Sequence, residues 1–224
     1  RKRYRSCLDK LTNLVQKWNK LEDDALEFCI HLGDIIDGNE TPQQTATDLD
    51  SVLKQLKLKF PTYHVIGNHC LRHPRQQLEK ALGFDTFGGN YYAFQVKTMR
   101  FIVLDGCEVH LDSGKASCVQ EAKQLLEKYP LSDYKWMENF NGAVGETQRQ
   151  WLTKELNEAR QAKQRVVVFC HLPLLEEASS IRHLLWDKDA LLAILESFKD
   201  VVVAYINGHY HQGGFTIQKK HKYR

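Results

Sequence analysis

The chain has 224 residues, a length that fits one domain with a sizeable hydrophobic core. Hydrophobic residues make up 42% of it and charged residues 26%, as in ordinary globular proteins. The net charge of +3 is too small to indicate a nucleic-acid partner, and no apolar run approaches the length of a membrane span. We therefore expect neither nucleic acid nor a membrane among the partners of this protein.

Cysteine usage indicates a reducing compartment. The six cysteines contain no Cys-x-x-Cys pair, and several lie in or beside apolar segments where thiols pack as small hydrophobic groups. The basic opening residues 1–5 (RKRYR) are not followed by the apolar stretch of a signal peptide. We expect reduced cysteines and a cytoplasmic protein.

Helices and strands alternate in the first part of the chain. Residues 6–21 carry Leu, Val and Trp at steps of three and four, the spacing of an amphipathic helix with Ser6 as its cap. Residues 43–58 repeat this spacing, and the β-branched or aromatic runs 28–32 and 62–66 predict strands. The short connections predict right-handed crossovers and a largely parallel sheet.

The later segments continue the alternation. They are helix 74–82, a hairpin of strands 91–96 and 100–104, helix 117–129, helix 147–163, strand 166–170, helix 190–198 and strand 201–206. Thr147 is expected to cap its helix, and residues 215–217 to begin another strand. Residues 1–224 are expected to form a single domain, in which residues 105–145 form an insertion or lid.

Polar side chains follow four of the predicted strands. They lie in the segments 33–37 (GDIID), 67–69 (GNH), His171 and 208–211 (GHYH). A lone histidine beside a strand is more often a core or turn residue, but core packing does not explain Asp, Asn and His at four strand ends. Carboxylate, amide and imidazole ligands suit Mn²⁺, Fe or Zn, and Asp34 stands where a carboxylate can bridge two ions.

The order of these motifs, from Gly33 to His211, resembles the calcineurin-like metallophosphoesterase family. Residues 32–39, 67–71, 101–106 and 140–142 resemble more narrowly its manganese-dependent ADP-ribose/CDP-alcohol diphosphatases. The resemblance implies an α/β fold, a metallophosphoesterase-type β-sandwich flanked by helices. It also implies a binuclear hydrolase, in which a metal-bound hydroxide cleaves the diphosphate bond of a small nucleotide-diphosphate substrate, ADP-ribose or CDP-choline or CDP-glycerol.

The resemblance assigns roles to individual residues. The implied metal ligands are Asp34, Asn68, His171, His209 and His211. Asp34 would bridge two divalent ions, with manganese favoured over Fe, Zn or Mg, and His211 would bind the second ion. His69 would stabilise the transition state or protonate the leaving group. Asp37 is expected to orient its loop or a ligand histidine.

One family motif has no counterpart here. An Asp-x-His or Asp-x-Gln motif should end a strand upstream of Gly33, where the only aspartates are Asp9, Asp23 and Asp24, in helical or loop contexts. We expect that the opening strand, and closing strands beyond Phe215, are missing from the chain as given. The second ion would then keep only Asp34 and His211, and this chain itself would be catalytically weak.

Two alternatives stay open: a generic phosphodiesterase or phosphomonoesterase, and a metallophosphoesterase-fold scaffold without activity. We expect a monomer. Among the other polar residues, His31 and His64 are predicted to be core histidines. The predicted surface histidines are His73, His110 and His183. Asn141 either contacts the substrate or belongs to an ordinary tight turn.

Overall fold

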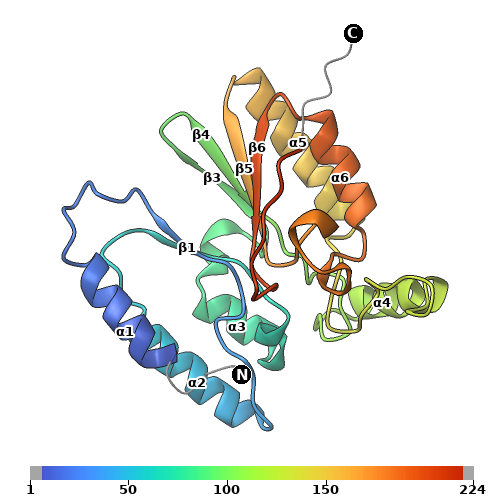
Figure 1. Ribbon diagram of the computed structural model, residues 1–224. Coiled ribbons are helices and arrows are strands. Elements are labelled where there is room, and N and C mark those ends of the chain that lie inside the picture. The colour runs from blue at the N-terminus through green and yellow to red at the C-terminus, as the bar shows by residue number, and fades with distance from the viewer. Residues whose placement is uncertain (1–6, 219–224) are drawn as a thin grey trace.

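The computed structural model describes residues 7–218, in which helices and strands alternate along the chain (Figure 1). The helices are α1 (Cys7–Trp18), α2 (Pro42–Gln55), α3 (Arg75–Ala81), α4 (Ala116–Lys128), α5 (Glu146–Gln161) and α6 (Lys188–Ser197). The strands are β1 (Cys29–His31), β2 (Thr62–His64), β3 (Tyr92–Val96), β4 (Met99–Val103), β5 (Arg165–Cys170) and β6 (Val202–Asn207). These elements confirm the predicted order up to residue 207, while the predicted cap Ser6 lies outside the described residues.

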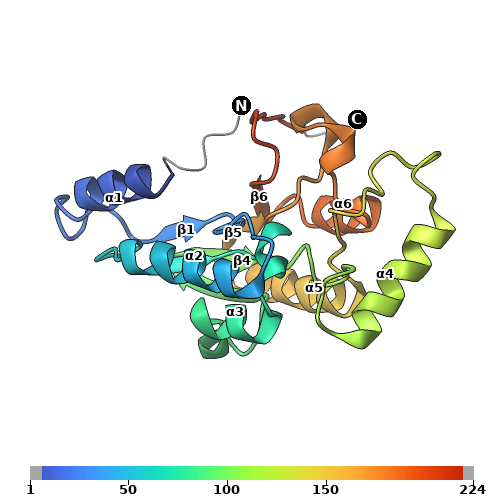
Figure 2. The same cartoon turned by 90° about the horizontal axis from the view of Figure 1, so that it is seen from below.

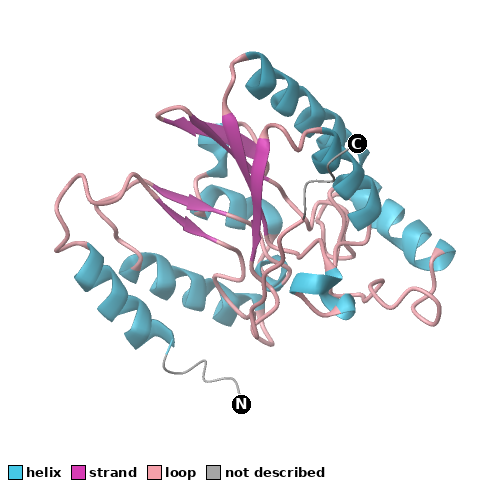
Figure 3. Cartoon of the chain, turned by 45° about the horizontal axis from the view of Figure 1, so that its top comes forward, coloured by secondary structure: helices cyan, strands magenta, loops and turns pink. Residues whose placement is uncertain are grey.

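The strands form two sheets (Figure 3). β1 and β2 make a parallel pair, in which His31 stands opposite His64. The larger sheet has the order β3-β4-β5-β6, with an antiparallel β3–β4 hairpin and parallel pairing from β4 to β6. The hairpin and the mainly parallel pairing are as predicted. The parallel strands direct their carboxyl ends to one edge of each sheet.

Aromatic packing joins the two sheets. The ring of Phe28, just before β1, lies 5.1 Å from Phe94 and 4.8 Å from Phe101 of the hairpin. Tyr63 of β2 stacks on Phe94 with ring centroids 3.7 Å apart. Such pairs contribute about 0.5–1.5 kcal/mol beyond their buried area. This cluster therefore holds the β1–β2 pair against the larger sheet.

Helices cover the outer faces. α5 and α6 lie side by side along the larger sheet, and α1 packs on α2 next to β1 (Figure 1). α4 projects from the side of the molecule opposite α1 (Figure 2). The chain around α4 has a small core of its own, made of Val109, Ala122, Met137, Ala143 and Trp186. No helix within residues 7–218 is long and apolar enough to cross a membrane.

Two predicted local features are wrong. α5 begins after Gly145, not at Thr147, because the carboxylate of Asp187 accepts hydrogen bonds from the backbone N–H groups of Val144 (3.1 Å) and Gly145 (3.2 Å). A carboxylate at this position also interacts favourably with the positive end of the helix dipole. Residues 215–217 form no strand, since no described strand pairs with them, and their apolar side chains are exposed.

Candidate metal centre and its cavity

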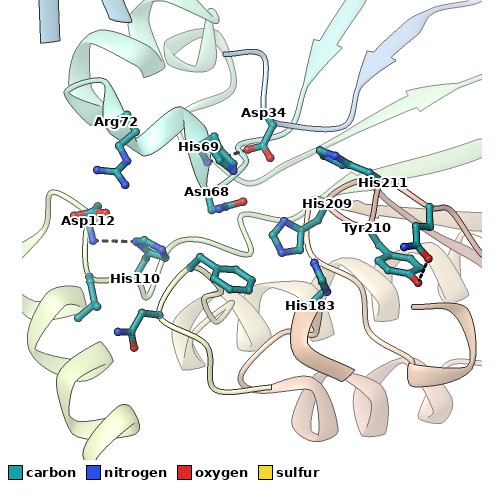
Figure 4. Close-up of a pocket in the computed structure, with 14 residues that line it drawn as sticks. Asp34, Asn68, His69, Arg72, His110, Asp112, His183, His209, Tyr210 and His211 are labelled. Atoms are coloured by element: carbon teal, nitrogen blue, oxygen red, sulfur yellow. Dashed lines mark hydrogen bonds between the residues drawn. The ribbon is translucent and has the colours of Figure 1, made fainter. Parts of the chain in front are cut away.

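The carboxyl ends of β1, β2, β5 and β6 bring four of the predicted ligands together. Asp34, His171 and His209 each offer a ligand atom, and these atoms all lie within 4.8 Å of one another. The amide oxygen of Asn68 lies 3.2 Å from Nε2 of His171. His211 lines the same cavity but is not one of the three residues within 4.8 Å (Figure 4).

The backbone at the centre is held in unusual conformations. Asp34 has φ +52° and His209 φ +63°, in the left-handed region that non-glycine residues seldom adopt. Gly67 packs so closely on Asp34 that a Cβ atom there would lie 2.3 Å from Oδ1 and 2.4 Å from the backbone nitrogen. Strained backbone of this kind persists only where the surrounding structure enforces it, and it is concentrated at functional sites.

His171 is buried and directs both ring nitrogens at oxygen acceptors. Nδ1 lies 2.8 Å from the carbonyl oxygen of Leu32, and Nε2 lies 3.1 Å from Oδ2 of Asp34 and 3.2 Å from Oδ1 of Asn68. These oxygens require a positive charge between them, either a proton on Nε2 or a cation in its place. Burial raises the pKa of Asp34, but the hydrogen bond and charge of His171 outweigh it and bring the pKa to about 2. The donor set therefore fits a divalent cation that replaces the proton.

Asn141 determines which nitrogen of His209 is available. The amide nitrogen of Asn141 donates to the carbonyl oxygens of Trp136 (3.0 Å) and Arg182 (2.8 Å), which leaves Oδ1 to accept from Nε2–H of His209 at 3.1 Å. Burial and the neighbouring His171 lower the pKa of His209 to about 3, so the ring is neutral. The lone pair is then on Nδ1, and a ligand histidine held by its other nitrogen is the usual arrangement at metal sites.

His69 stands beside the candidate ligands without being one. Its backbone N–H donates to Oδ1 of Asp34 (2.9 Å), and its Nδ1 lies 2.9 Å from the carbonyl oxygen and 3.1 Å from Oδ1 of Asp37. With Nδ1 occupied by Asp37, Nε2 is the nitrogen left for a substrate. Asp37 thus orients His69, which is not a candidate ligand, whereas the predicted roles of Asp37 were to orient its loop or a ligand histidine.

These residues line one side of a cavity of about 680 Å³ (Figure 4). Arg72, at the end of the 3₁₀ helix η2 (His69–Arg72), continues this wall beside His69. The facing side is formed by residues of the 105–145 region and of the chain near residue 183. The members from these later segments are His110, Leu111, Asp112, Asn139, Phe140 and His183. The volume is large enough for a nucleotide-sized ligand.

Several predictions about single residues are wrong. His73 (6% exposed) and His110 (3% exposed) are buried, and His183 is half-buried in the cavity wall, its ring 5.1 Å from that of His209. For Asn141 the substrate-contact alternative is wrong, because the residue is fully buried and serves His209 and two carbonyl groups. The tight-turn alternative is confirmed, since its backbone N–H donates to the carbonyl oxygen of Glu138 at 2.9 Å. Arg72 was not singled out, although its position three residues after His69 in a short helix was a usable signal.

The upstream aspartates do not join the centre. Asp9 lies in α1, and Asp23 is almost fully exposed and pairs with Lys59 at 2.7 Å. No carboxylate before Asp34 belongs to the candidate ligand group within residues 7–218.

Comparison with known proteins shows which family this fold and site belong to. A profile of the calcineurin-like phosphoesterase family matches residues 5–213. The chain belongs to that family. It is 32% identical over 231 residues to the manganese-dependent ADP-ribose/CDP-alcohol diphosphatase of Arabidopsis thaliana, covering 96% of this chain and 73% of the relative. The mouse protein of the same name is 30% identical over 248 residues, with 96% and 72% covered.

A solved structure agrees with this family assignment. A dimetal phosphatase from Danio rerio superposes with a TM-score of 0.82 and 27% sequence identity, over 94% of this chain and 74% of that one. The expected metallophosphoesterase fold, with helices flanking its sheets, is thereby confirmed.

Proposed function

We propose that this metallophosphoesterase hydrolyses the diphosphate bond of small nucleoside-diphosphate-linked compounds, ADP-ribose or a CDP-alcohol such as CDP-choline or CDP-glycerol. The observation that carries the proposal is the convergence of Asp34, His171 and His209 within 4.8 Å at a cavity of nucleotide size. The curated relatives with the diphosphatase name match nearly the whole chain and support the substrate class.

We assign two divalent ions, manganese by preference and Fe, Zn or Mg as alternatives. Asp34, Asn68, His171 and His209 would hold these ions, with Asp34 shared between them, in keeping with the lone pairs that face each other there. His211, exposed on the same cavity, is assigned to the second ion. When bound, the ions supply Lewis acidity toward the phosphoryl oxygens and activate a water molecule.

The chain's own residues position the reaction. Leu32 and Asn141 fix the rings of His171 and His209 through their second nitrogens. Asp37 accepts from Nδ1–H of His69, so that Nε2 faces the cavity. A proton on Nε2 would donate to the phosphoryl oxygens and stabilise their charge. The oxygen of water forms the new bond to phosphorus and its protons are released to solvent. The P–O–P bridge breaks, and the bridging oxygen departs with the second phosphate and the electron pair of the broken bond. That phosphate is a stable anion and needs little protonation.

Residues 105–145 are assigned as a lid that selects the substrate. Leu111, Asp112 and Phe140 from this region form the cavity wall across from the candidate ligands. We also infer a monomeric cytoplasmic enzyme that acts on a free small molecule. Buried thiols at Cys29, Cys70, Cys107 and Cys170 support the reducing compartment.

Turnover with Mn²⁺ tests the proposal. ADP-ribose should yield AMP and ribose 5-phosphate, and CDP-choline should yield CMP and phosphocholine, faster than bis(p-nitrophenyl) phosphate is cleaved. Hydrolysis of the aryl diester alone would identify a generic phosphodiesterase. No hydrolysis of any of them by a chain that includes an upstream Asp-x-His or Asp-x-Gln motif would identify an inactive scaffold.

Replacing His69 by alanine separates catalysis from metal binding. The variant should lose about 10²–10⁴-fold in kcat, because it removes a hydrogen-bond donor to the transition state. Mn²⁺ affinity, measured by calorimetry, should change little because His69 is not among the grouped ligands. Retention of kcat would show that His69 does not act on the substrate.

A further inference from the structure

We propose that Arg72 binds the second phosphate of the substrate, the one that departs when the diphosphate bond is cleaved. The inference rests on the proposed function and names a specificity determinant for it. Arg72 lies at the end of η2 (His69–Arg72) and lines the same cavity as Asp34 and His69.

The 3₁₀ helix sets the position of Arg72 relative to His69. Such a helix has three residues per turn, so that side chains three apart lie on the same face, about 6 Å apart along the axis. His69 and Arg72 are the first and last residues of η2, and both face the cavity (Figure 4). In that view Asp34, His69 and Arg72 follow one another along the cavity wall.

A neighbouring glycine fixes the stem of Arg72. At Gly38, with φ +79°, an added Cβ would lie 2.4 Å from Cγ and 2.5 Å from Cβ of Arg72. The stem therefore packs directly on the bare Cα of Gly38. The preceding residue, Asp37, holds the ring of His69. Two consecutive residues thus position both cavity-facing side chains.

The guanidinium of Arg72 has no bonded partner among the residues that the structure describes. It makes no hydrogen bond or ion pair with any residue between 7 and 218, and it is exposed to the cavity. By contrast, Arg75 pairs with Asp105 and Arg149 pairs with Asp187. A guanidinium is always charged and offers N–H donors in the planar arrangement that binds phosphate through two oxygens. Arg72 is therefore available for an anion in the cavity.

The chemistry of a diphosphate places an anion there. When one phosphorus lies at the candidate metal ligands beside His69, the other is only one bridging oxygen away. As water attacks, the electron pair of the breaking P–O bond stays on the bridging oxygen, so the departing phosphate gains negative charge. Arg72 then interacts more strongly with the transition state than with the bound substrate. An aryl phosphodiester has no second phosphate and cannot use this contact.

Exchange of Arg72 for glutamine tests the inference through a selectivity ratio. The ratio of kcat/KM for ADP-ribose to that for bis(p-nitrophenyl) phosphate, both with Mn²⁺, should fall tenfold or more in Arg72→Gln. Arg72→Lys should recover part of the loss, because it restores the charge without the two-pronged geometry. The control is Arg165→Gln, the same exchange at an exposed position at the start of β5, which should keep the ratio of the unaltered protein.

A binding measurement separates this inference from the proposed function. The unaltered protein should bind the non-hydrolysable α,β-methylene-ADP more tightly than AMP, and Arg72→Gln should reduce that preference tenfold or more. Selective loss of this preference in a protein that hydrolyses no diphosphate would refute the proposed function but keep the role of Arg72. If Arg72→Gln hydrolysed diphosphates and kept both the kcat/KM ratio and the binding preference of the unaltered protein, the role of Arg72 alone would be refuted. Absence of any preference for α,β-methylene-ADP in the unaltered protein would also overturn it.

Discussion

Gly67 is the point at which a single added methyl group should disturb the candidate metal centre. Its Cβ would lie 2.3 Å from Oδ1 and 2.4 Å from the backbone nitrogen of Asp34. The carboxylate cannot simply rotate away, since Oδ1 also accepts the N–H of His69 at 2.9 Å and Oδ2 lies 3.1 Å from Nε2 of His171. Gly67→Ala must therefore move the backbone of one strand end and carry Asp34 with it.

The size of the effect follows from that clash. Overpacking a closely packed position costs about 1–3 kcal/mol, and for a protein of this size each kcal/mol lowers Tm by about 2–4 °C. We expect a decrease in Tm of about 4–8 °C for a cost of about 2 kcal/mol, measured in EDTA so that metal binding does not contribute. Displacement of Asp34 should also weaken Mn²⁺ binding about 10–100-fold, a loss typical of misaligned ligands.

Gly89→Ala is the matched control. A Cβ at Gly89 meets no atom within 4 Å, and the residue does not have positive φ. The control should keep both the Tm in EDTA and the Mn²⁺ affinity of the unaltered protein, determined by calorimetry. If Gly67→Ala gave the same two values as Gly89→Ala, the close approach of the strand ends would not be what holds Asp34 in place.

Two further predictions concern buried polar groups. Asn141→Asp replaces the amide donor that faces two buried carbonyl groups, and it should destabilise the protein by about 1–3 kcal/mol for each of these groups. The control, Asn157→Asp at an exposed position, should have little effect. Urea unfolding in EDTA compares the two variants. His64 has its pKa lowered by burial to about 4, against 6.5 in the unfolded chain. The contribution of neutral His64 to the free energy of unfolding is complete above pH 6.5. It falls by about 3 kcal/mol as the pH decreases to 4, because only the unfolded chain takes up the proton in that range. The stability of His64→Gln should decrease less over that pH range, and an unchanged slope would assign the acid sensitivity to other groups.

The candidate ligands were predictable because they depend on local pattern and topology. Each follows an apolar run of strand length, and parallel strands direct their carboxyl ends to one edge. Asp34, Asn68, His171 and His209 therefore meet, although they lie far apart along the chain. The ring orientation of His171 was not predictable, since it depends on the carbonyl oxygen of Leu32, which follows a strand of the other sheet.

Burial of loop histidines could not be predicted in this way. His110 lies in the 105–145 segment, which has no clear strand character, a position typical of a surface residue. In the structure its ring stacks parallel to Trp186 at 6.3 Å, in a small core made by segments from two distant parts of the chain. The helix start at Gly145 depends in the same way on Asp187, a residue well beyond the helix it caps.

Two adjacent residues, Phe140 and Asn141, connect the proposed lid, residues 105–145, to the candidate metal centre. Phe140 forms part of the cavity wall, and its ring lies 5.8 Å from that of His209. Asn141, the next residue, is fully buried and fixes Nε2 of the same histidine. A change in the wall that shifts the backbone at Phe140 must therefore also shift Asn141 and rotate His209. For this reason the part of the region near residue 140 cannot adapt to a new substrate independently of the metal centre, whereas Asp112 has no such connection to a candidate ligand among the described residues.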